Sequence, residues 1–317
     1  MKKVVYVTGC LGFIGFHVTK ACLDKGWYVY GIDKCTYAAN WNLLNELRKY
    51  DQQFKFSIED INDLTSLYDC DYIINTAAET HVDNSIESSD VFLKSNVNGV
   101  HKLLELIKTK PKSRRPILLH FSTDEVYGDI LNGFHAETDL LKPSNPYAAT
   151  KAAADMLVLA WARTYEIPYV IIRPTNNYGI GQYVEKFIPK AIKNLSLGKR
   201  IVMHDQGLPK RTWLHVSDTA AATIKIIDNN VINEIYNISG NFETRNIDVA
   251  DRILKHFFSN KKYVASDNYD FSEIRPGQDV RYAIDDSKLK SLGWEPKASF
   301  DKELPIIVKW YKENFIW

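Results

Sequence analysis

The sequence of 317 residues has little cysteine, and what it has is not arranged for cross-linking or for binding metal. Its four cysteines, Cys10, Cys22, Cys35 and Cys70, all lie in the first quarter of the chain, and none belongs to a C-x-x-C pair. Disulfide frameworks and zinc sites both need closely organised cysteines. We therefore expect no disulfide framework, no metal site and a reducing, cytoplasmic compartment.

The chain also lacks an excess of charge of either sign. Forty Lys+Arg face 39 Asp+Glu, for a formal net charge of +1, so nucleic acid is not an expected partner. No later apolar run is long enough to cross a bilayer, so no membrane partner is expected. The start, Lys2-Lys3 followed by VVYVTGCLGFIGF, carries three evenly spaced glycines and no small-residue cleavage site. We interpret it as a strand, a turn and a helix rather than as a signal peptide.

What the chain does have is an ordinary globular composition, 45% hydrophobic and 25% charged, and enough length for a large core. In its first half, short β-branched runs alternate with amphipathic segments. This alternation predicts an α/β fold with a doubly wound, mainly parallel, Rossmann-like sheet. The expected strands are 3–8, 28–32, 54–57, 72–75, 117–122 and 169–173, and the expected helices include 14–25, 91–108 and 147–165.

After Pro174 the alternation loosens. Loops rich in Asn, Gly and Pro, such as TNNYGIGQ, HDQGLPKR and SGNFETRN, separate shorter elements. We therefore expect a first domain over residues 1–175. A smaller C-terminal lobe should occupy residues 176–317, interleaved with the last elements of the first domain.

A glycine-rich turn follows the first expected strand. The stretch VTGCLGFIG places Gly9, Gly12 and Gly15 in the pattern G-x-x-G-x-x-G, where the backbone can approach a pyrophosphate at a helix N-terminus. Asp33 ends the second strand about 20 residues further on, where an acid binds the adenosine ribose. Its charge favours NAD over NADP, and the adjacent Lys34 weakens that preference.

The later strand ends add to the cofactor site. Asp60 and Ile61 follow the third strand and are placed to bracket an adenine. The small Ala77 and Ala78 follow the fourth and let the chain pass close to a flat cofactor. Over these segments the expected cofactor-binding residues are Gly9, Gly12, Phe13, Ile14, Gly15, Asp33, Lys34, Thr36, Asp60, Ile61, Ala77 and Ala78.

Two further patterns suggest chemistry. Tyr147 and Lys151 lie four apart in YAATK and share one face of an expected helix. An ammonium beside a phenol lowers the tyrosine pKa and makes a general base for a sugar hydroxyl. In HFSTDEVYG, Thr123, Asp124 and Glu125 stand side by side at a strand end, where two acids suit a core poorly.

These features resemble the extended short-chain dehydrogenase/reductase superfamily nearly from end to end. More narrowly, TDE, AETHVDNSI, DKCTYAAN, PSNPYAATKA, NNYG, EKFIPK and RPGQDVRY resemble the dTDP-glucose 4,6-dehydratases and their UDP-glucose relatives. The resemblance implies NAD as cofactor, a nucleotide-sugar substrate, loss of water to give a 4-keto-6-deoxy sugar, and a homodimer formed through helices 91–108 and 156–165.

The resemblance also implies roles. Tyr147, with Lys151 and Thr123, would take the C4 hydroxyl proton. Glu125 would take the C5 proton, and Asp124 would protonate the departing C6 hydroxyl; neighbouring like charges push the two pKa values apart. The implied substrate contacts are Thr80, Thr123, Asn176, Lys186, Arg211, Asn246 and Arg275, and the further cofactor contacts are Ser95, Tyr147, Lys151 and Asn177.

Three positions depart from the family pattern. Asn84 stands where the family commonly has Arg, Gln278 where it often has His, and Met203-His204 where contacts to the base would fall. None of these removes a catalytic group, but together they leave the base, uracil or thymine, undetermined.

Other functions remain open to a chain with these patterns. A nucleotide-sugar 4-epimerase or a UDP-glucuronate decarboxylase shares the glycine turn, Tyr147 and Lys151. The epimerase needs no acid at Asp124 or Glu125, and the decarboxylase typically lacks the aspartate. A non-catalytic nucleotide-sensing protein would tolerate the loss of all four residues. The acid pair therefore favours the dehydratase.

Overall fold

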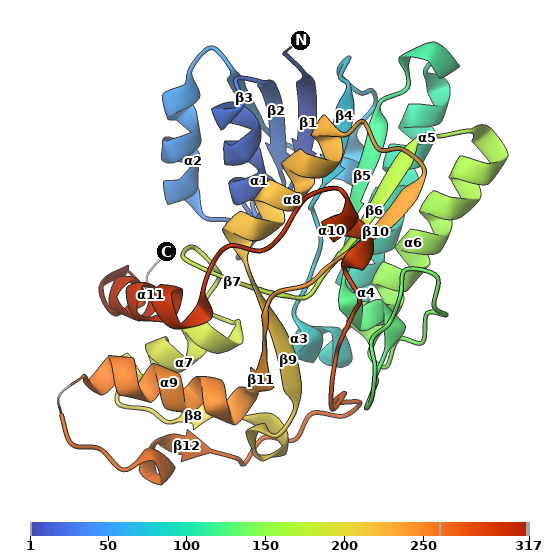
Figure 1. Cartoon of the computed structure of the whole chain (residues 1–317). Coiled ribbons are helices and arrows are strands. Elements are labelled where there is room, and N and C mark those ends of the chain that lie inside the picture. Colours follow the sequence, from blue (N-terminus) through green and yellow to red (C-terminus); the bar gives the residue numbers. More distant parts are fainter. Residues whose placement is uncertain (1, 260, 315–317) are drawn as a thin grey trace.

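The computed structural model describes residues 2–259 and 261–314. Its main layer is a parallel sheet of seven strands in the order β10-β6-β5-β4-β1-β2-β3 (Figure 1). The strands are β1 (Val4–Thr8), β2 (Tyr28–Asp33), β3 (Phe54–Ile58), β4 (Tyr72–Asn75), β5 (Ile117–Phe121), β6 (Tyr169–Pro174) and β10 (Glu234–Ile238). The expected α/β, doubly wound parallel sheet is confirmed, and each expected strand lies within one residue of its observed bounds.

Helices cover both faces of this sheet, which explains why its central strands are apolar on both sides. On one face lie α1 (Phe13–Asp24), α2 (Trp41–Leu47) and α8 (Val216–Asp228). On the other lie α5 (Gly99–Thr109) and α6 (Pro146–Tyr165), which pack on Ile73, Leu118 and Ile171. Across the described ranges, 2–259 and 261–314, no helix is long and apolar enough to cross a membrane.

The expected helix 91–108 is interrupted in the structure. A short α4 (Asp90–Phe92) leads into a π-helical stretch, Leu93–Asn98, before α5 begins. In this wider stretch the buried Asn96 side chain bonds the backbone of Glu79, at 2.9 and 3.0 Å, and the Thr150 hydroxyl at 3.0 Å. Such π-helical turns are frequent at functional sites. Here the turn ties the residues after β4 to α6.

Helix α6 begins where local chemistry requires it. The Asn145 side chain accepts a hydrogen bond from the backbone amide of Ala148 at 2.8 Å, and Pro146 occupies the first helical position. The helix therefore starts one residue before Tyr147. This start fixes the Tyr-x-x-x-Lys pair on the first turns of the helix.

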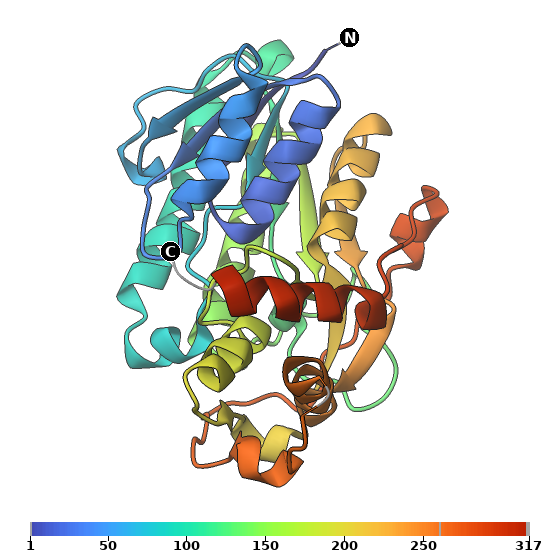
Figure 2. The same cartoon turned by 90° about the vertical axis from the view of Figure 1, so that its left-hand side faces the viewer.

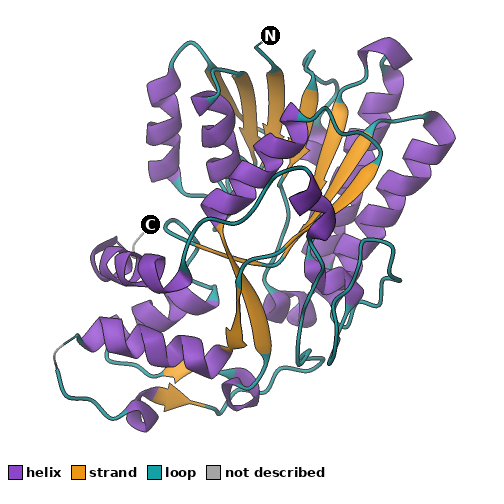
Figure 3. Ribbon diagram, in the orientation of Figure 1, coloured by secondary structure: helices purple, strands orange, loops and turns teal. Residues whose placement is uncertain are grey.

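The lobe has its own small sheets and its own core. Strands β7 (Asn176–Tyr178), β9 (Lys210–His215) and β11 (Phe242–Arg245) form one sheet, and β8 (Ile201–Val202) pairs with β12 (Tyr269–Asp270) (Figure 3). Helices α7 (Phe187–Ser196), α9 (Asn246–Phe258) and α11 (Phe300–Asn314) pack together below the main sheet (Figure 2). Their shared core includes Trp213, Leu254 and Phe300.

The chain passes between the two parts more than once. After β9 it runs into α8, which packs on α1, and β10 then pairs with β6 at the edge of the main sheet, with Ile235 opposite Ile171. The short α10 (Ser287–Ser291) packs beside β10. We therefore propose the division into a domain of residues 1–175 and a lobe of residues 176–317, with α8 and β10 as the interleaved elements.

Candidate active site

A first pocket opens at the carboxyl ends of β1 to β4. Here the strand order changes direction: β1, β2 and β3 follow one another toward one edge of the sheet, and β4, β5 and β6 toward the other. In open α/β sheets this is where nucleotides bind. Ten of the expected cofactor residues line it: Gly9, Gly12, Asp33, Lys34, Thr36, Asp60, Ile61, Ala77, Ala78 and Ser95. Its other walls, which sequence reasoning did not single out, include Ala38, Ala39, Glu59, Asn62, Thr76 and Glu79.

The glycine turn leaves bare backbone facing this pocket. Gly9 has φ +73°, and a Cβ there would lie 2.7 Å from the Cα of Ala77. Gly15 does not line the pocket; a Cβ on it would lie 2.0 Å from the carbonyl oxygen of Gly9, so its role is close packing of α1 on the turn. Phe13 and Ile14, in the first turn of α1, also lie outside the lining. This cradle, which any Cβ would fill, fits a dinucleotide.

Asp33 is held rigidly at the rim of the pocket. Its carboxylate accepts hydrogen bonds from the backbone amides of Leu11, at 3.0 Å, and Cys35, at 2.8 Å. Burial raises the pKa of Asp33, and these two hydrogen bonds oppose the rise. Lys34 lies 3.5 Å from Glu79 and donates to the Ser95 hydroxyl at 3.3 Å. A fixed carboxylate with free lone pairs suits the ribose hydroxyls of an adenosine.

The acid pair follows β5 on a 3₁₀ turn, Asp124–Tyr127, that Thr123 caps. The Thr123 hydroxyl donates to Asp124 Oδ1 at 3.2 Å and accepts from the Glu125 amide at 3.3 Å. Asp124 is 3% exposed, and among the described residues its Oδ2 has no hydrogen-bond partner. Burial, reinforced by the charge of Glu125, raises the pKa of Asp124 to about 8. Near neutral pH Asp124 is therefore mainly a neutral acid.

Glu125 faces the second pocket and has two partners that sequence reasoning missed. Its Oε2 lies 3.3 Å from the Asn145 amide nitrogen and 3.5 Å from the Tyr282 hydroxyl. The Tyr282 hydroxyl donates its single proton to Asp279 at 2.5 Å, so its contact with Glu125 is the weaker of the two. Burial raises the pKa of Glu125, and the charge of Arg211 limits the rise. Asn145 lies in PSNPYAATKA and Tyr282 in RPGQDVRY, so each is close in sequence to a residue that was predicted to belong to the site.

Tyr147 and Lys151 are both buried, but they do not interact as expected. The Lys151 ammonium donates to the Phe121 carbonyl oxygen, and burial lowers its pKa to about 8. Burial and the charge of Glu125 raise the pKa of Tyr147, whereas hydrogen bonding with Thr123 opposes the rise. The expectation that Lys151 lowers this tyrosine pKa is wrong, because the ammonium is directed to a carbonyl and is itself poorly solvated.

Besides Phe13, Ile14 and Gly15, three further expected cofactor contacts lie away from the first pocket. Tyr147 and Lys151 are not among the residues that line it. Asn177 donates to the Thr175 carbonyl at 2.9 Å and accepts from the Thr219 hydroxyl at 2.5 Å, so both ends of its side chain are engaged within the chain. Its local role is to fix the segment after β6.

The second pocket lies between the main sheet and the lobe. Six of the expected substrate residues line it together with Glu125: Thr80, Asn176, Lys186, Arg211, Asn246 and Arg275. Thr123 is the exception, because it sits behind Glu125 as the cap of the 3₁₀ turn. Further lining residues that sequence reasoning missed include His81, Asp83, Asn145, Glu185, Phe187, Lys190, Asp279 and Tyr282.

The cationic side chains in this pocket are positioned by the chain itself. Lys186 donates to the Thr80 hydroxyl at 2.9 Å and to its carbonyl at 2.8 Å. Arg211 lies over the Tyr282 ring, 4.2 Å from its centre, and donates to the Asp279 carbonyl at 3.0 Å. Together with Arg275 they form a basic wall suited to a diphosphate.

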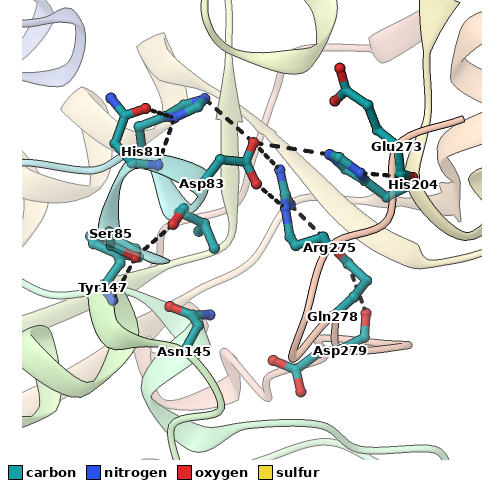
Figure 4. A network of polar contacts seen from close by, with 12 residues as sticks. His81, Asp83, Ser85, Asn145, Tyr147, His204, Glu273, Arg275, Gln278 and Asp279 are labelled. Atoms are coloured by element: carbon teal, nitrogen blue, oxygen red, sulfur yellow. Dashed lines mark hydrogen bonds and ion pairs between the residues drawn. The ribbon is translucent and has the colours of Figure 1, made fainter. Parts of the chain in front are cut away.

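The positions that depart from the family pattern also line this region or touch it. Asn84 bonds the His81 ring, with 2.9 Å between its Oδ1 and Nδ1. Gln278 accepts from Arg275 at 3.1 Å. His204 lies 4.0 Å from Asp83 (Figure 4). Met203, the preceding residue, is buried. Among the described residues, no group of three His, Cys, Asp or Glu is arranged to hold a metal ion.

A glycine turn at the switch point of a doubly wound sheet, a Tyr-x-x-x-Lys helix and a basic pocket under a C-terminal lobe define an extended short-chain dehydrogenase/reductase. Comparison with known proteins narrows this class. A family model described as GDP-mannose 4,6 dehydratase matches residues 6–305, and the chain belongs to that family.

Three similar proteins illustrate the family. The dTDP-glucose 4,6-dehydratase of Haemophilus influenzae is 38% identical, over 98% of this chain and 98% of its own. A trifunctional UDP-glucose 4,6-dehydratase/UDP-4-keto-6-deoxy-D-glucose 3,5-epimerase/UDP-4-keto-L-rhamnose-reductase of Arabidopsis thaliana is 38% identical, over 99% of this chain and 48% of that longer protein. The crystal structure of DesIV, a dTDP-glucose 4,6-dehydratase from Streptomyces venezuelae with NAD bound, superposes with a TM-score of 0.91 at 34% identity, covering 98% of this chain and 97% of that one.

Proposed function

We propose that the chain is an NAD-dependent nucleotide-sugar 4,6-dehydratase. It is a hydro-lyase that converts dTDP-glucose or UDP-glucose to the 4-keto-6-deoxy sugar with loss of water. The observation that carries the proposal is the acid pair: a buried Asp124 whose pKa is raised to about 8, beside a Glu125 that lines the substrate pocket. The full-length similarity to dehydratases of both nucleotide types supports it.

The elimination requires one carboxylic acid and one carboxylate at the same moment. Glu125 is the base that takes the proton from C5, and Asp124 is the acid that protonates the departing C6 hydroxyl. The separation of their protonation states follows from burial and from the charge of one acid acting on the other. The Asn145 amide holds the Glu125 carboxylate in place, and the Tyr282 hydroxyl lies beside it.

Oxidation at C4 precedes the elimination and makes the C5 proton acidic. Tyr147 takes the C4 hydroxyl proton, assisted by Thr123, whose hydrogen bond opposes the rise in the tyrosine pKa. NAD, when bound, would supply the reversible hydride-transfer chemistry. Gly9, Gly12, Asp33 and the residues after β3 and β4 would hold this cofactor, and Lys151 on α6 would supply a positive charge near the reacting groups.

The substrate's diphosphate is held by the lobe. Lys186, Arg211 and Arg275 provide the cationic side chains. Asn176, whose buried Oδ1 atom has no hydrogen-bond partner among the described residues, and Asn246, at the start of α9, provide polar groups beside them. Thr80 positions the Lys186 ammonium.

A product assay tests the proposal directly. The purified protein is incubated separately with dTDP-glucose and UDP-glucose, and the 4-keto-6-deoxy product is followed by its absorbance in alkali. Glu125→Gln protein serves as the matched control for trace contaminating activity. We expect product from at least one sugar nucleotide with the wild type. Absence of product from both, and also from CDP- and GDP-sugars, contradicts an enzymatic role.

The nucleobase of the substrate is a further question, because similar proteins include enzymes named for dTDP-glucose and for UDP-glucose. Met203 and His204 follow β8 and line the same pocket as Glu125. A comparison of kcat/KM for the two sugar nucleotides in one competition experiment identifies the preferred base.

We also propose a homodimer and a cytoplasmic location. Helices α4 to α6 carry exposed apolar side chains on the outer face of the molecule, among them Val91, Leu93 and Met156, which are 54%, 47% and 48% exposed. Light scattering tests the dimer: Met156→Glu should shift the mass toward the monomer, and a wild-type monomer contradicts it. The four free cysteines support a reducing compartment.

A further inference from the structure

An ion pair crosses the substrate pocket between the two parts of the molecule. Asp83 lies on α3 (Val82–Glu87), beside the main sheet, and Arg275 lies on the loop after β12 in the lobe. Arg275 Nε lies 2.6 Å from Asp83 Oδ1, and Nη2 lies 2.9 Å from Oδ2 (Figure 4). The third nitrogen, Nη1, donates to Gln278 Oε1 at 3.1 Å.

Asp83 binds the side of the Arg275 guanidinium that a phosphate group would also bind. A carboxylate and a phosphate both bind arginine through two parallel N–H donors on one side of the fork. Asp83 occupies the Nε and Nη2 side with both of its oxygens. The hydrogen bonds and charge of Arg275 hold the Asp83 pKa below its usual value, although burial alone would raise it, so the carboxylate stays ionised near neutral pH.

Asp83 is not left alone if Arg275 turns away from it. Its Oδ2 also lies 3.8 Å from His81 Nε2 and 4.0 Å from His204 Nε2. The two imidazoles flank the carboxylate from α3 and from the turn after β8 (Figure 4). The Asp83 side chain is 29% exposed, so a released carboxylate can be solvated, and Arg275 can exchange one anion for another without stranding a buried charge.

We propose that Asp83 competes with the substrate's diphosphate for Arg275 and thereby sets the affinity of this pocket for nucleotides. The inference rests on the proposed function, because it assumes that a nucleoside diphosphate sugar occupies this pocket. Asp83 lowers the affinity for every nucleotide by the strength of its pair with Arg275. Only a ligand that offers that arginine a better anion, as a diphosphate does, gains the contact.

Nucleotide affinity tests the proposal. The probes are dTDP and UDP, titrated calorimetrically into the NAD-loaded protein, with Asp83→Asn as the variant because it keeps the shape and removes the charge. We expect the variant to bind the better nucleotide about two- to fivefold more tightly, the range of a partly exposed ion pair. The control is Glu87→Gln, an exposed acid on the same helix with no contact to Arg275, and its Kd should equal that of the wild type.

A second variant separates competition for Arg275 from a general charge effect. In an Arg275→Met background, adding Asp83→Asn should leave the Kd unchanged. Equal tightening in both backgrounds overturns the proposal, as does weaker or unchanged binding by Asp83→Asn alone, which is the result expected of a merely structural pair.

The test also distinguishes the two levels of inference. If the wild type binds a nucleotide and makes the 4-keto product but Asp83→Asn binds no more tightly, the competition is refuted and the proposed function stands. If the wild type neither binds a nucleotide nor makes product, both are overturned.

Discussion

The cofactor pocket takes its walls from the turns that follow four neighbouring strands, whereas the substrate pocket gathers side chains as distant along the chain as Thr80 and Tyr282. The first is floored by the bare backbone of glycines and alanines, with Lys34 and the carboxylates of Asp33, Glu59, Asp60 and Glu79 around it. The second is shaped by charge, because Arg211, Lys186 and Arg275 meet Glu125 and Asp83 across it. Shape should therefore matter most in the first pocket, and single polar atoms in the second.

The largest expected effect comes from removing one oxygen from the substrate side. Tyr147→Phe should lower turnover about 10³-fold, because in the proposed mechanism Tyr147 is the group that takes the C4 hydroxyl proton. Transient reduction of the bound cofactor, followed by absorbance, should disappear as well. Tyr165→Phe, at the exposed end of the same helix, is the control. Normal turnover by Tyr147→Phe refutes the assignment.

Glu125→Gln should divide the reaction into its stages. C4 oxidation should still occur and reduced cofactor should accumulate, because Tyr147 is intact. Loss of the C5 proton should be about 10²-fold slower, since the amide is not a base. Exchange of the C5 hydrogen with deuterated solvent, followed by mass spectrometry, measures this step. Exchange at the wild-type rate would show that Glu125 is not the base.

Asp124 should make stability depend on pH. Its folded-state pKa, about 8, lies above the ordinary value of 3.8, so the folded protein holds this proton more tightly than the unfolded chain does. Its contribution is complete below about pH 4 and is lost as the pH rises through 8, at up to about 1.4 kcal/mol per pH unit. Urea titrations between pH 5 and 8 should show a smaller loss for Asp124→Asn. Parallel curves contradict the shift.

In the cofactor pocket, adding a single methyl group should be enough to disturb the fold and the binding of NAD. Gly15→Ala puts a Cβ 2.0 Å from the Gly9 carbonyl oxygen, so α1 or the turn must move. We expect a loss of about 1–3 kcal/mol in the free energy of unfolding and weaker NAD binding. Gly99→Ala is the matched control, because its Cβ would meet Ile61 only at an ordinary 3.8 Å. Equal behaviour of the two variants would remove the contrast between the pockets.

The smallest effect concerns the turn that carries His204. Asp205 and Gln206 both have left-handed backbone conformations, with φ 45° and 56°, which cost non-glycine residues energy. Gln206→Gly should raise stability by about 0.5–1 kcal/mol. Gly207→Ala, at φ +71° and with a Cβ 2.9 Å from Ile247, should lower it. Opposite signs in urea unfolding are the expected result.

The contrast between the pockets also explains what the sequence could predict. The glycine turn, Asp33 and the alanines after β4 are local patterns, and all of these except Gly15 proved to line one pocket. Asp83, Asn145 and Tyr282 escaped notice because their importance depends on partners 192, 20 and 157 residues away, which no local pattern reveals. The direction of the Tyr147 pKa shift was missed for a different reason. Spacing on a helix shows that two side chains share a face, but not which carbonyl one of them bonds.

The position of β10 has a consequence for how the chain is made. A nascent chain that has left the ribosome as far as β6 holds six of the seven strands of the main sheet, with the apolar Val170, Ile171 and Ile172 at an open edge. The strand that covers this edge is synthesised only after β7, α7 and β9 have emerged. An open apolar edge is a template for pairing with other chains. The window between the synthesis of β6 and β10 is therefore when this protein most needs a chaperone.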